Sequence, residues 1–137
     1  MKWISPYLFF QGNCEEAITF YKNCLGGELA VQRFGDTEMP VEESYKDKIM
    51  HAELTIGDLK IMFSDGAPHK EITSGDNIQL NLGFDDEEEL EKVFKKLAEG
   101  GTITMPLEVT FWQAKFGMLV DKFGVRWMVN CSLKDPS

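Results

Sequence analysis

The strongest constraint on the fold of this chain is an internal repeat. Each half contains an alternating apolar segment followed by an amphipathic helical pattern that ends at a Gly pair, Gly26-Gly27 in the first half and Gly100-Gly101 in the second. The apolar stripes of the two helical patterns also match, with Ala17, Phe20, Tyr21 and Cys24 followed 73 residues later by Leu90, Val93, Phe94 and Leu97. This agreement indicates that one structural unit has been duplicated.

Strand patterns complete each half. In the first half they lie at residues 2–11, 28–34 and in a hairpin over 49–64, and in the second at 78–84 and in a hairpin over 116–130. Asn13 with Glu16 and Asp85 with Glu88 have the spacing of capping boxes. We therefore predict an α+β fold of two tandem βαβββ modules with curved mixed sheets. Module 1 covers about residues 2–65 and module 2 about 76–131 of one domain, 1–137. The alternative is a generic α+β domain whose halves look alike because amphipathic helices look alike.

Charge and cysteine usage exclude several classes of partner. The formal net charge of −9 disfavours binding to nucleic acid or to anionic lipid, and no apolar run approaches the length of a membrane span. Three cysteines, Cys14, Cys24 and Cys131, show no C-x-x-C spacing, so we expect a cytoplasmic protein with reduced thiols. A helix N-terminus could lower the pKa of Cys14, although a buried small side chain is the favoured interpretation.

Alternation along the strands assigns side chains to two faces of each sheet. Since one helix covers only one face, the other becomes a cavity wall or an interface. The apolar residues at 78, 80, 82 and 84 are expected to face the helix, as are Val125, Trp127 and Val129. In the first hairpin the same rule places Met50, Ala52, Leu54, Ile56, Leu59, Ile61 and Phe63 in the core. The open face then carries polar groups mixed with Tyr, Phe and Met.

Such a mixture is more typical of a ligand cavity than of a solvated sheet face. We predict a cavity that binds a small organic molecule. Trp112 lies in an irregular stretch after Pro106 and is a candidate for a cavity lid or a dimer contact, with core packing as the alternative. The predicted ligand-binding residues are Tyr7, Phe9, Met62, Gln79, Asn81, Trp112, Arg126 and Met128.

His51 and Glu53 form the candidate catalytic pair. A spacing of two along a strand places both side chains on one face, where the carboxylate could orient the imidazole as a general base. The alternative is that His51 bonds to Ser64 or to the backbone and only lines the face. Lys60 and Arg126 could hold an anionic ligand or could form ordinary salt bridges.

Several motifs resemble the vicinal oxygen chelate superfamily, which includes glyoxalase I, bleomycin-resistance proteins and extradiol dioxygenases, and within it the PhnB-like branch. They are Pro6-Tyr7-Leu8-Phe9-Phe10, Gly12 to Ile18 with Phe20-Tyr21, Lys48 to Ala52, and Phe111 to Cys131. The resemblance implies paired βαβββ modules and a homodimer. Nothing resembles a nucleotide-binding Gly-rich loop, so the methyltransferase label used in this branch is not expected to apply.

The resemblance also locates the metal ligands of the superfamily. They would fall near Ser5 or Pro6, at Met62, near Asn77 or Gln79, and at Met128, where no imidazole or carboxylate occurs. We therefore expect no metal site and no cofactor. The expected function is binding of a small molecule, as in the bleomycin-resistance proteins. The alternative is an enzyme that uses His51 and Glu53, either with a metal in a rearranged site or by metal-free acid–base catalysis.

Overall fold

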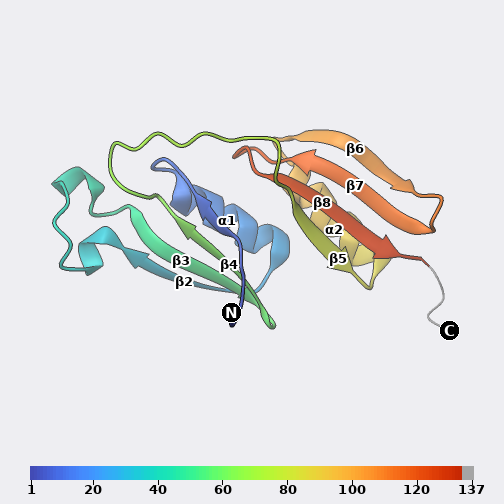
Figure 1. Cartoon of the computed structure of the whole chain (residues 1–137), viewed down its shortest axis with the longest axis horizontal. Coiled ribbons are helices and arrows are strands. Elements are labelled where there is room, and N and C mark those ends of the chain that lie inside the picture. The colour runs from blue at the N-terminus through green and yellow to red at the C-terminus, as the bar shows by residue number, and fades with distance from the viewer. Residues whose placement is uncertain (134–137) are drawn as a thin grey trace. The chain divides into compact units, whose positions relative to one another are not determined.

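Each half of the chain folds into a four-stranded mixed sheet with one helix packed on one of its faces (Figure 1). The computed structural model describes residues 1–133 and divides into two units, Met1–Thr73 and Ser74–Ser137. The predicted α+β fold of two βαβββ modules is confirmed. The grouping of both modules into one domain, residues 1–137, stays a prediction.

The first unit has the sheet order β1-β4-β3-β2, in which only β1 and β4 are parallel. Its elements are β1 (Tyr7–Phe9), α1 (Cys14–Leu25), β2 (Glu28–Arg33), two 3-10 turns (Phe34–Asp36 and Glu43–Tyr45), β3 (Ile49–Ile56) and β4 (Leu59–Ser64). β1 is much shorter than the predicted strand over 2–11, because only Tyr7 to Phe9 pair with β4. Trp3 and Ile4 before it are exposed.

The second unit repeats this order as β5-β8-β7-β6, again with one parallel pair, β5 and β8. Its elements are β5 (Leu80–Phe84), α2 (Glu87–Ala98), β6 (Thr102–Val109), β7 (Ala114–Val120) and β8 (Arg126–Ser132). The prediction that Ile78 faces the helix is wrong, because β5 begins only at Leu80 and Ile78 is 74% exposed. Pro106 lies within β6, which as an edge strand tolerates a missing N–H donor and pairs with β7 through two register shifts.

The core of each unit lies between its sheet and its helix. Phe63 on β4 is fully buried and stacks on Tyr21 of α1, with ring centroids 5.7 Å apart. Trp127 and Val129 on β8 are likewise fully buried, as predicted. Neither α1 nor α2, nor any other helix within residues 1–133, has the length and apolar composition needed to cross a lipid bilayer.

Two core predictions in the first hairpin are wrong. Ile49, rather than Met50, is fully buried. Gln32 pairs with His51 and Arg33 pairs with Ile49, so Met50 is the extra residue of a bulge that reverses the alternation at this point. Leu59 is 69% exposed, because it is the first residue of β4 and directly follows the turn.

The repeated Gly pairs allow the chain to pass close to the sheet after each helix. A Cβ atom added to Gly27 would lie 2.5 Å from the carbonyl oxygen of Thr55 on β3. A Cβ on Gly101 would overlap the carbonyl oxygen of Val120 on β7 and lie 2.9 Å from the Cα of Asp121. The second glycine of each pair is therefore required by the packing of backbone against backbone.

Replacing Gly101 with Ala is expected to lower the free energy of unfolding by about 2 kcal/mol, since the new methyl group must displace backbone rather than a flexible side chain. Urea denaturation followed by Trp fluorescence measures this loss. Gly83 on β5 is the matched control, because a Cβ there meets nothing within 4 Å. Equal stabilities of Gly101→Ala and Gly83→Ala would contradict the packing argument.

Candidate functional site

The face of the first sheet that α1 leaves uncovered carries both members of the predicted catalytic pair. Met62 on β4 pairs with Tyr7 on β1 and with Glu53 on β3, so these three side chains lie in one row across the sheet. This row is on the side opposite Phe63, which packs on α1. Met62 is 9% exposed, although no helix covers it, since it lies between the side chains of both neighbouring strands.

Hydrogen bonds connect four polar side chains on this face. The Tyr7 hydroxyl lies 2.8 Å from Nδ1 of His51, and Nε2 of His51 lies 3.2 Å from Oε1 of Glu53. Nζ of Lys60 lies 3.4 Å from Oε2 of Glu53. The hydrogen bond from His51, together with the positive charge of Lys60, lowers the pKa of the Glu53 carboxyl group. The chain Tyr7–His51–Glu53–Lys60 is called the polar chain below.

The ionisation of Glu53 fixes the direction of these hydrogen bonds. A carboxylate can only accept, so Nε2 of His51 carries the proton that is donated to Glu53. In a neutral imidazole Nδ1 is then an acceptor, and the Tyr7 hydroxyl donates to it. Burial raises the pKa of Tyr7, so its hydroxyl group is protonated near neutral pH.

An aromatic surface adjoins the polar chain. The rings of Tyr7 and Phe9 are stacked, with centroids 4.8 Å apart and planes inclined by 18°. Tyr7 is 38% exposed and Phe9 is 49% exposed. Both residues were predicted to bind ligand; the structure places Tyr7 beside His51, with ring centroids 5.5 Å apart, and Phe9 on the ring of Tyr7. The alternative partner of His51, Ser64, instead accepts a hydrogen bond from the backbone N–H of Gly66.

The uncovered face of the second sheet is richer in thioether and amide groups. Met128 on β8 pairs with Asn81 on β5 and with Met118 on β7, which in turn pairs with Met105 on β6. In the next row Asn130 pairs with Phe116, and Nδ2 of Asn130 donates to Oδ1 of Asn81 over 3.1 Å. The structure thus brings the predicted Asn81 and Met128 together. Met105, Phe116 and Met118 were not predicted, although alternation along β7 would have found Phe116 and Met118.

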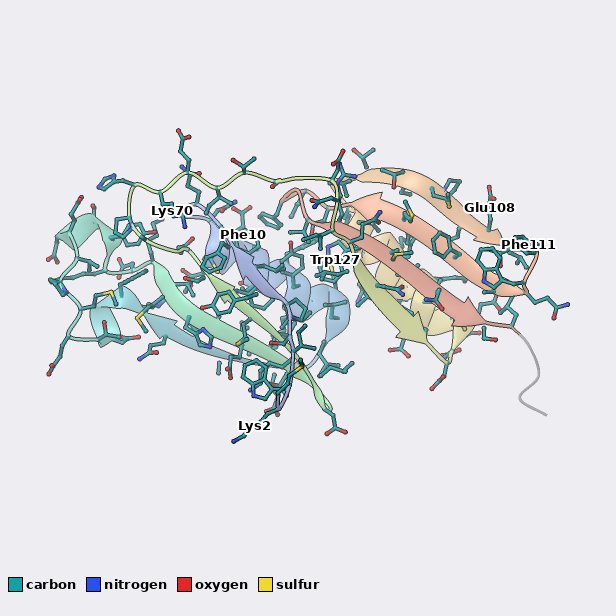
Figure 2. The ribbon with its side chains drawn as sticks, viewed as in Figure 1. Lys2, Phe10, Lys70, Glu108, Phe111 and Trp127 are labelled. Atoms are coloured by element: carbon teal, nitrogen blue, oxygen red, sulfur yellow. The ribbon has the colours of Figure 1, made fainter. Side chains whose placement is uncertain are left out.

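The remaining predicted residues are less closely grouped. Nε of Arg126 donates to the carbonyl oxygen of Gly75 over 3.3 Å, and Gln79 lies just before β5. Trp112 is 51% exposed at the turn between β6 and β7, so core packing is excluded for this residue. Its ring meets that of Phe111 edge to face, and Figure 2 shows Phe111 at the same turn.

The cysteines do not contribute a reactive group. Cys14, Cys24 and Cys131 are buried and are not joined to one another in disulfides. Burial raises the pKa of Cys14 strongly, and the nearby Asp65 raises it further, which outweighs the position of Cys14 at the start of α1. A lowered thiol pKa at this helix N-terminus is therefore excluded.

The donors present do not fit the divalent metal ion of the superfamily. Within residues 1–133, no three His, Cys, Asp or Glu side chains are grouped closely enough to hold such an ion. Met62 and Met128, which the resemblance places at ligand positions, offer thioether sulfur. Hard divalent cations prefer oxygen or nitrogen ligands.

Comparison with known proteins agrees with this fold. The model of the family described as 3-demethylubiquinone-9 3-methyltransferase matches residues 2–130. Protein YjdN of Escherichia coli is 36% identical, with 98% of each chain covered. The crystal structure of PA1353 from Pseudomonas aeruginosa is 47% identical, with a TM-score of 0.87 and coverage of 96% of this chain and 98% of the other.

A putative 3-demethylubiquinone-9 3-methyltransferase, PhnB protein, from Bacillus cereus is 30% identical, with a TM-score of 0.77 and coverage of 96% of this chain and all of the other. A glyoxalase/bleomycin resistance protein/dioxygenase family enzyme from Burkholderia phytofirmans shares the fold at 20% identity, with a TM-score of 0.62 and coverage of 93% and 95%. The chain therefore belongs to the PhnB-like family described as 3-demethylubiquinone-9 3-methyltransferase, and it shares the fold of the glyoxalase/bleomycin-resistance proteins.

Proposed function

We propose that this chain binds a small organic molecule on the uncovered faces of its sheets, without a metal ion or cofactor. Family and fold are those of a glyoxalase-type small-molecule-binding protein. The observation that carries the proposal is the exposed Tyr7–Phe9 stack beside the polar chain. Binding sites commonly combine an apolar or aromatic surface with a few oriented polar groups.

The uncovered face of the second sheet supports the same function. Unbranched thioether side chains adapt to ligands of varied shape, which suits Met105, Met118 and Met128 to contact with an apolar ligand. Asn81 and Asn130 add amide donors and acceptors to this surface. We propose that Gln79, Arg126 and Trp112 contribute at its margins.

Assembly and location are also part of the proposal. The resemblance to the superfamily supports a homodimer, because its members commonly pair modules across chains. Exposed Trp112 and Phe111 are candidates for that contact. The composition of the chain and its three buried cysteines, which are not joined to one another in disulfides, support a cytoplasmic protein. The acidic net charge disfavours nucleic acid and anionic membranes as partners.

Metal-free acid–base catalysis is the second candidate function. This function is favoured by two hydrogen bonds, one between Tyr7 and His51 and one between His51 and Glu53. An imidazole that a carboxylate orients is a common general base. The thioether donors give no support to a metal-dependent version. The methyltransferase of the family description is not part of the proposal.

A thermal-shift screen of aromatic metabolites and antibiotics tests the binding function, with native mass spectrometry to detect a ligand that copurifies. For compounds that stabilise the protein, Phe9→Ala is expected to raise the Kd about tenfold, the loss of one aromatic contact. Leu59→Ala is the matched control, since Leu59 is a 69% exposed apolar residue of β4 that alternation places on the other face of the same sheet, and it should leave the Kd unchanged. If Phe9→Ala and Met128→Ala bind these ligands as tightly as the wild type, the proposal that the uncovered sheet faces bind the ligand is contradicted.

A further inference from the structure

We propose that the polar chain selects ligands with a weakly acidic hydroxyl group on a planar ring, such as a phenol or a cyclic enol, and accepts the proton of that group. The inference rests on the proposed function, because it assumes that the uncovered face of the first sheet is a binding face. It goes further by naming the chemical group that this face recognises. Tyr7 is the residue that contacts the ligand, and His51 is the proton acceptor.

The direction of the hydrogen bonds leaves Tyr7 ready to receive a donor. Its hydroxyl proton is directed at Nδ1 of His51, 2.8 Å away, since Nε2 of His51 donates to Glu53. The Tyr7 oxygen also has a hydrogen bond with the Ser64 side chain, and a ligand O–H that donates to this oxygen takes its place beside Ser64 or replaces it. The 38% exposure of Tyr7 makes the residue accessible to such a ligand.

Proton transfer through Tyr7 involves two coupled proton movements. The ligand O–H bond breaks as its proton moves to the Tyr7 oxygen, while the original Tyr7 proton moves to Nδ1 of His51. The products are a ligand oxyanion, a neutral Tyr7 that now donates to it, and an imidazolium ion at His51. No electrons are transferred, and no third reactant is needed.

The surroundings of His51 favour this transfer. Glu53, on the same strand, contacts Nε2 and stabilises the imidazolium ion by its negative charge. Lys60 from β4 keeps Glu53 ionised, and Gln32 from β2, which is directly opposite His51, is uncharged. Ser64 of β4, which is uncharged and bonds to Tyr7, and Tyr7 of β1 also lie near His51. His51 is therefore the proton acceptor in this set.

The aromatic surface explains the preference for a planar ring. Phe9 lies beside Tyr7 in a stacked arrangement and is half exposed, so a ring that donates its hydroxyl to Tyr7 can lie against Phe9. Aromatic contacts of this kind add to the affinity gained from burial alone. A phenol or a cyclic enol meets both requirements, whereas an aliphatic alcohol is too weakly acidic and lacks the ring.

Spectroscopic titration with para-nitrophenol tests the inference, because its phenolate absorbs at longer wavelength than its phenol. Below the pKa of the free phenol, the wild-type protein should increase the phenolate absorbance. Above the pKa of the phenol, binding should take up one proton from solution, because the phenolate binds together with the proton that the relay holds. Para-nitroanisole, which lacks the hydroxyl group, should bind about tenfold more weakly.

Variants separate the proton relay from simple contact. Tyr7→Phe and His51→Gln should abolish the phenolate signal, and His51→Gln should also remove the proton uptake on binding above the pKa of the phenol. Phe9→Ala should weaken the binding of both probes to the same extent. The para-nitrophenol that still binds to this variant should show the phenolate absorbance. Circular dichroism and the unfolding midpoint verify that each variant is folded.

Binding of para-nitrophenol in its neutral form, or equal binding of the two probes, would overturn the relay and leave the proposed binding function intact. Absence of binding by either probe would also overturn the inference. The proposed function is judged separately by the ligands of the thermal-shift screen and by their response to Phe9→Ala. The two failures are thus distinguishable.

Discussion

Replacing Asp65 with Ala is expected to lower the free energy of unfolding by about 4 kcal/mol, because two buried backbone N–H groups lose the carboxylate oxygens that accept their hydrogen bonds. The Asp65 carboxylate is 3% exposed. Its two oxygens accept hydrogen bonds from the N–H of Cys14 over 2.9 Å and from the N–H of Ile49 over 2.8 Å. The side chain thereby fixes the first residue of α1 to the first residue of β3. Urea denaturation followed by far-UV circular dichroism measures the loss.

Two further variants make this expectation specific. Asp65→Asn keeps the size of the side chain and one acceptor oxygen, but its amide nitrogen faces a backbone donor, so we expect about half of the loss. Asp58→Ala removes an exposed carboxylate from the turn between β3 and β4 and should change stability by less than about 0.5 kcal/mol. A similar small effect of Asp65→Ala would show that the two N–H groups find other acceptors.

Asp65 also explains why the predicted capping box at Asn13 is wrong. The side chain of Asn13 makes no capping hydrogen bond, and the first helical N–H group bonds instead to Asp65, 51 positions along the chain. A local spacing rule cannot detect an acceptor that arrives through the fold. In the second unit the cap is local, but it is Asp86, which accepts from the N–H of Glu88, rather than the predicted Asp85.

The fold was predictable because its main signals are local and occur twice. Alternation placed Phe63, Trp127 and Val129 correctly in the core. It failed at Met50, where a bulge interrupts the pairing of β3 with β2. A bulge depends on the partner strand as well as on the strand that contains it, so period-two alternation carries no information about it.

The candidate site was only partly predictable for a related reason. A spacing of two along one strand was enough to bring His51 to Glu53, where their side chains meet at 3.2 Å. The contact of Tyr7 with His51 depends on parallel pairing of β1 with β4, and 44 positions separate the two residues. No local pattern gives that register. The polar chain therefore emerges only from the structure, whereas its central pair is already visible in the sequence.

Replacing Asp121 with Ala is expected to lower the free energy of unfolding by about 3 kcal/mol. The carboxylate is 3% exposed, and it accepts from Nε1 of the fully buried Trp127 over 2.8 Å and from the N–H groups of Phe123 and Val125. The two backbone donors lie in the partly buried turn between β7 and β8, where water can replace part of the lost bonding, so the expected loss is smaller than for Asp65.

The buried indole group accounts for much of the loss at Asp121, because it has no access to water. Trp127→Phe removes this donor and keeps an aromatic ring in the core. In the Trp127→Phe background, Asp121→Ala should therefore cost about 1 kcal/mol less than in the wild type. Equilibrium urea unfolding of the four proteins, followed by circular dichroism, measures the difference. If Asp121→Ala costs the same in both backgrounds, the indole hydrogen bond does not stabilise this unit, and the carboxylate acts only on the turn.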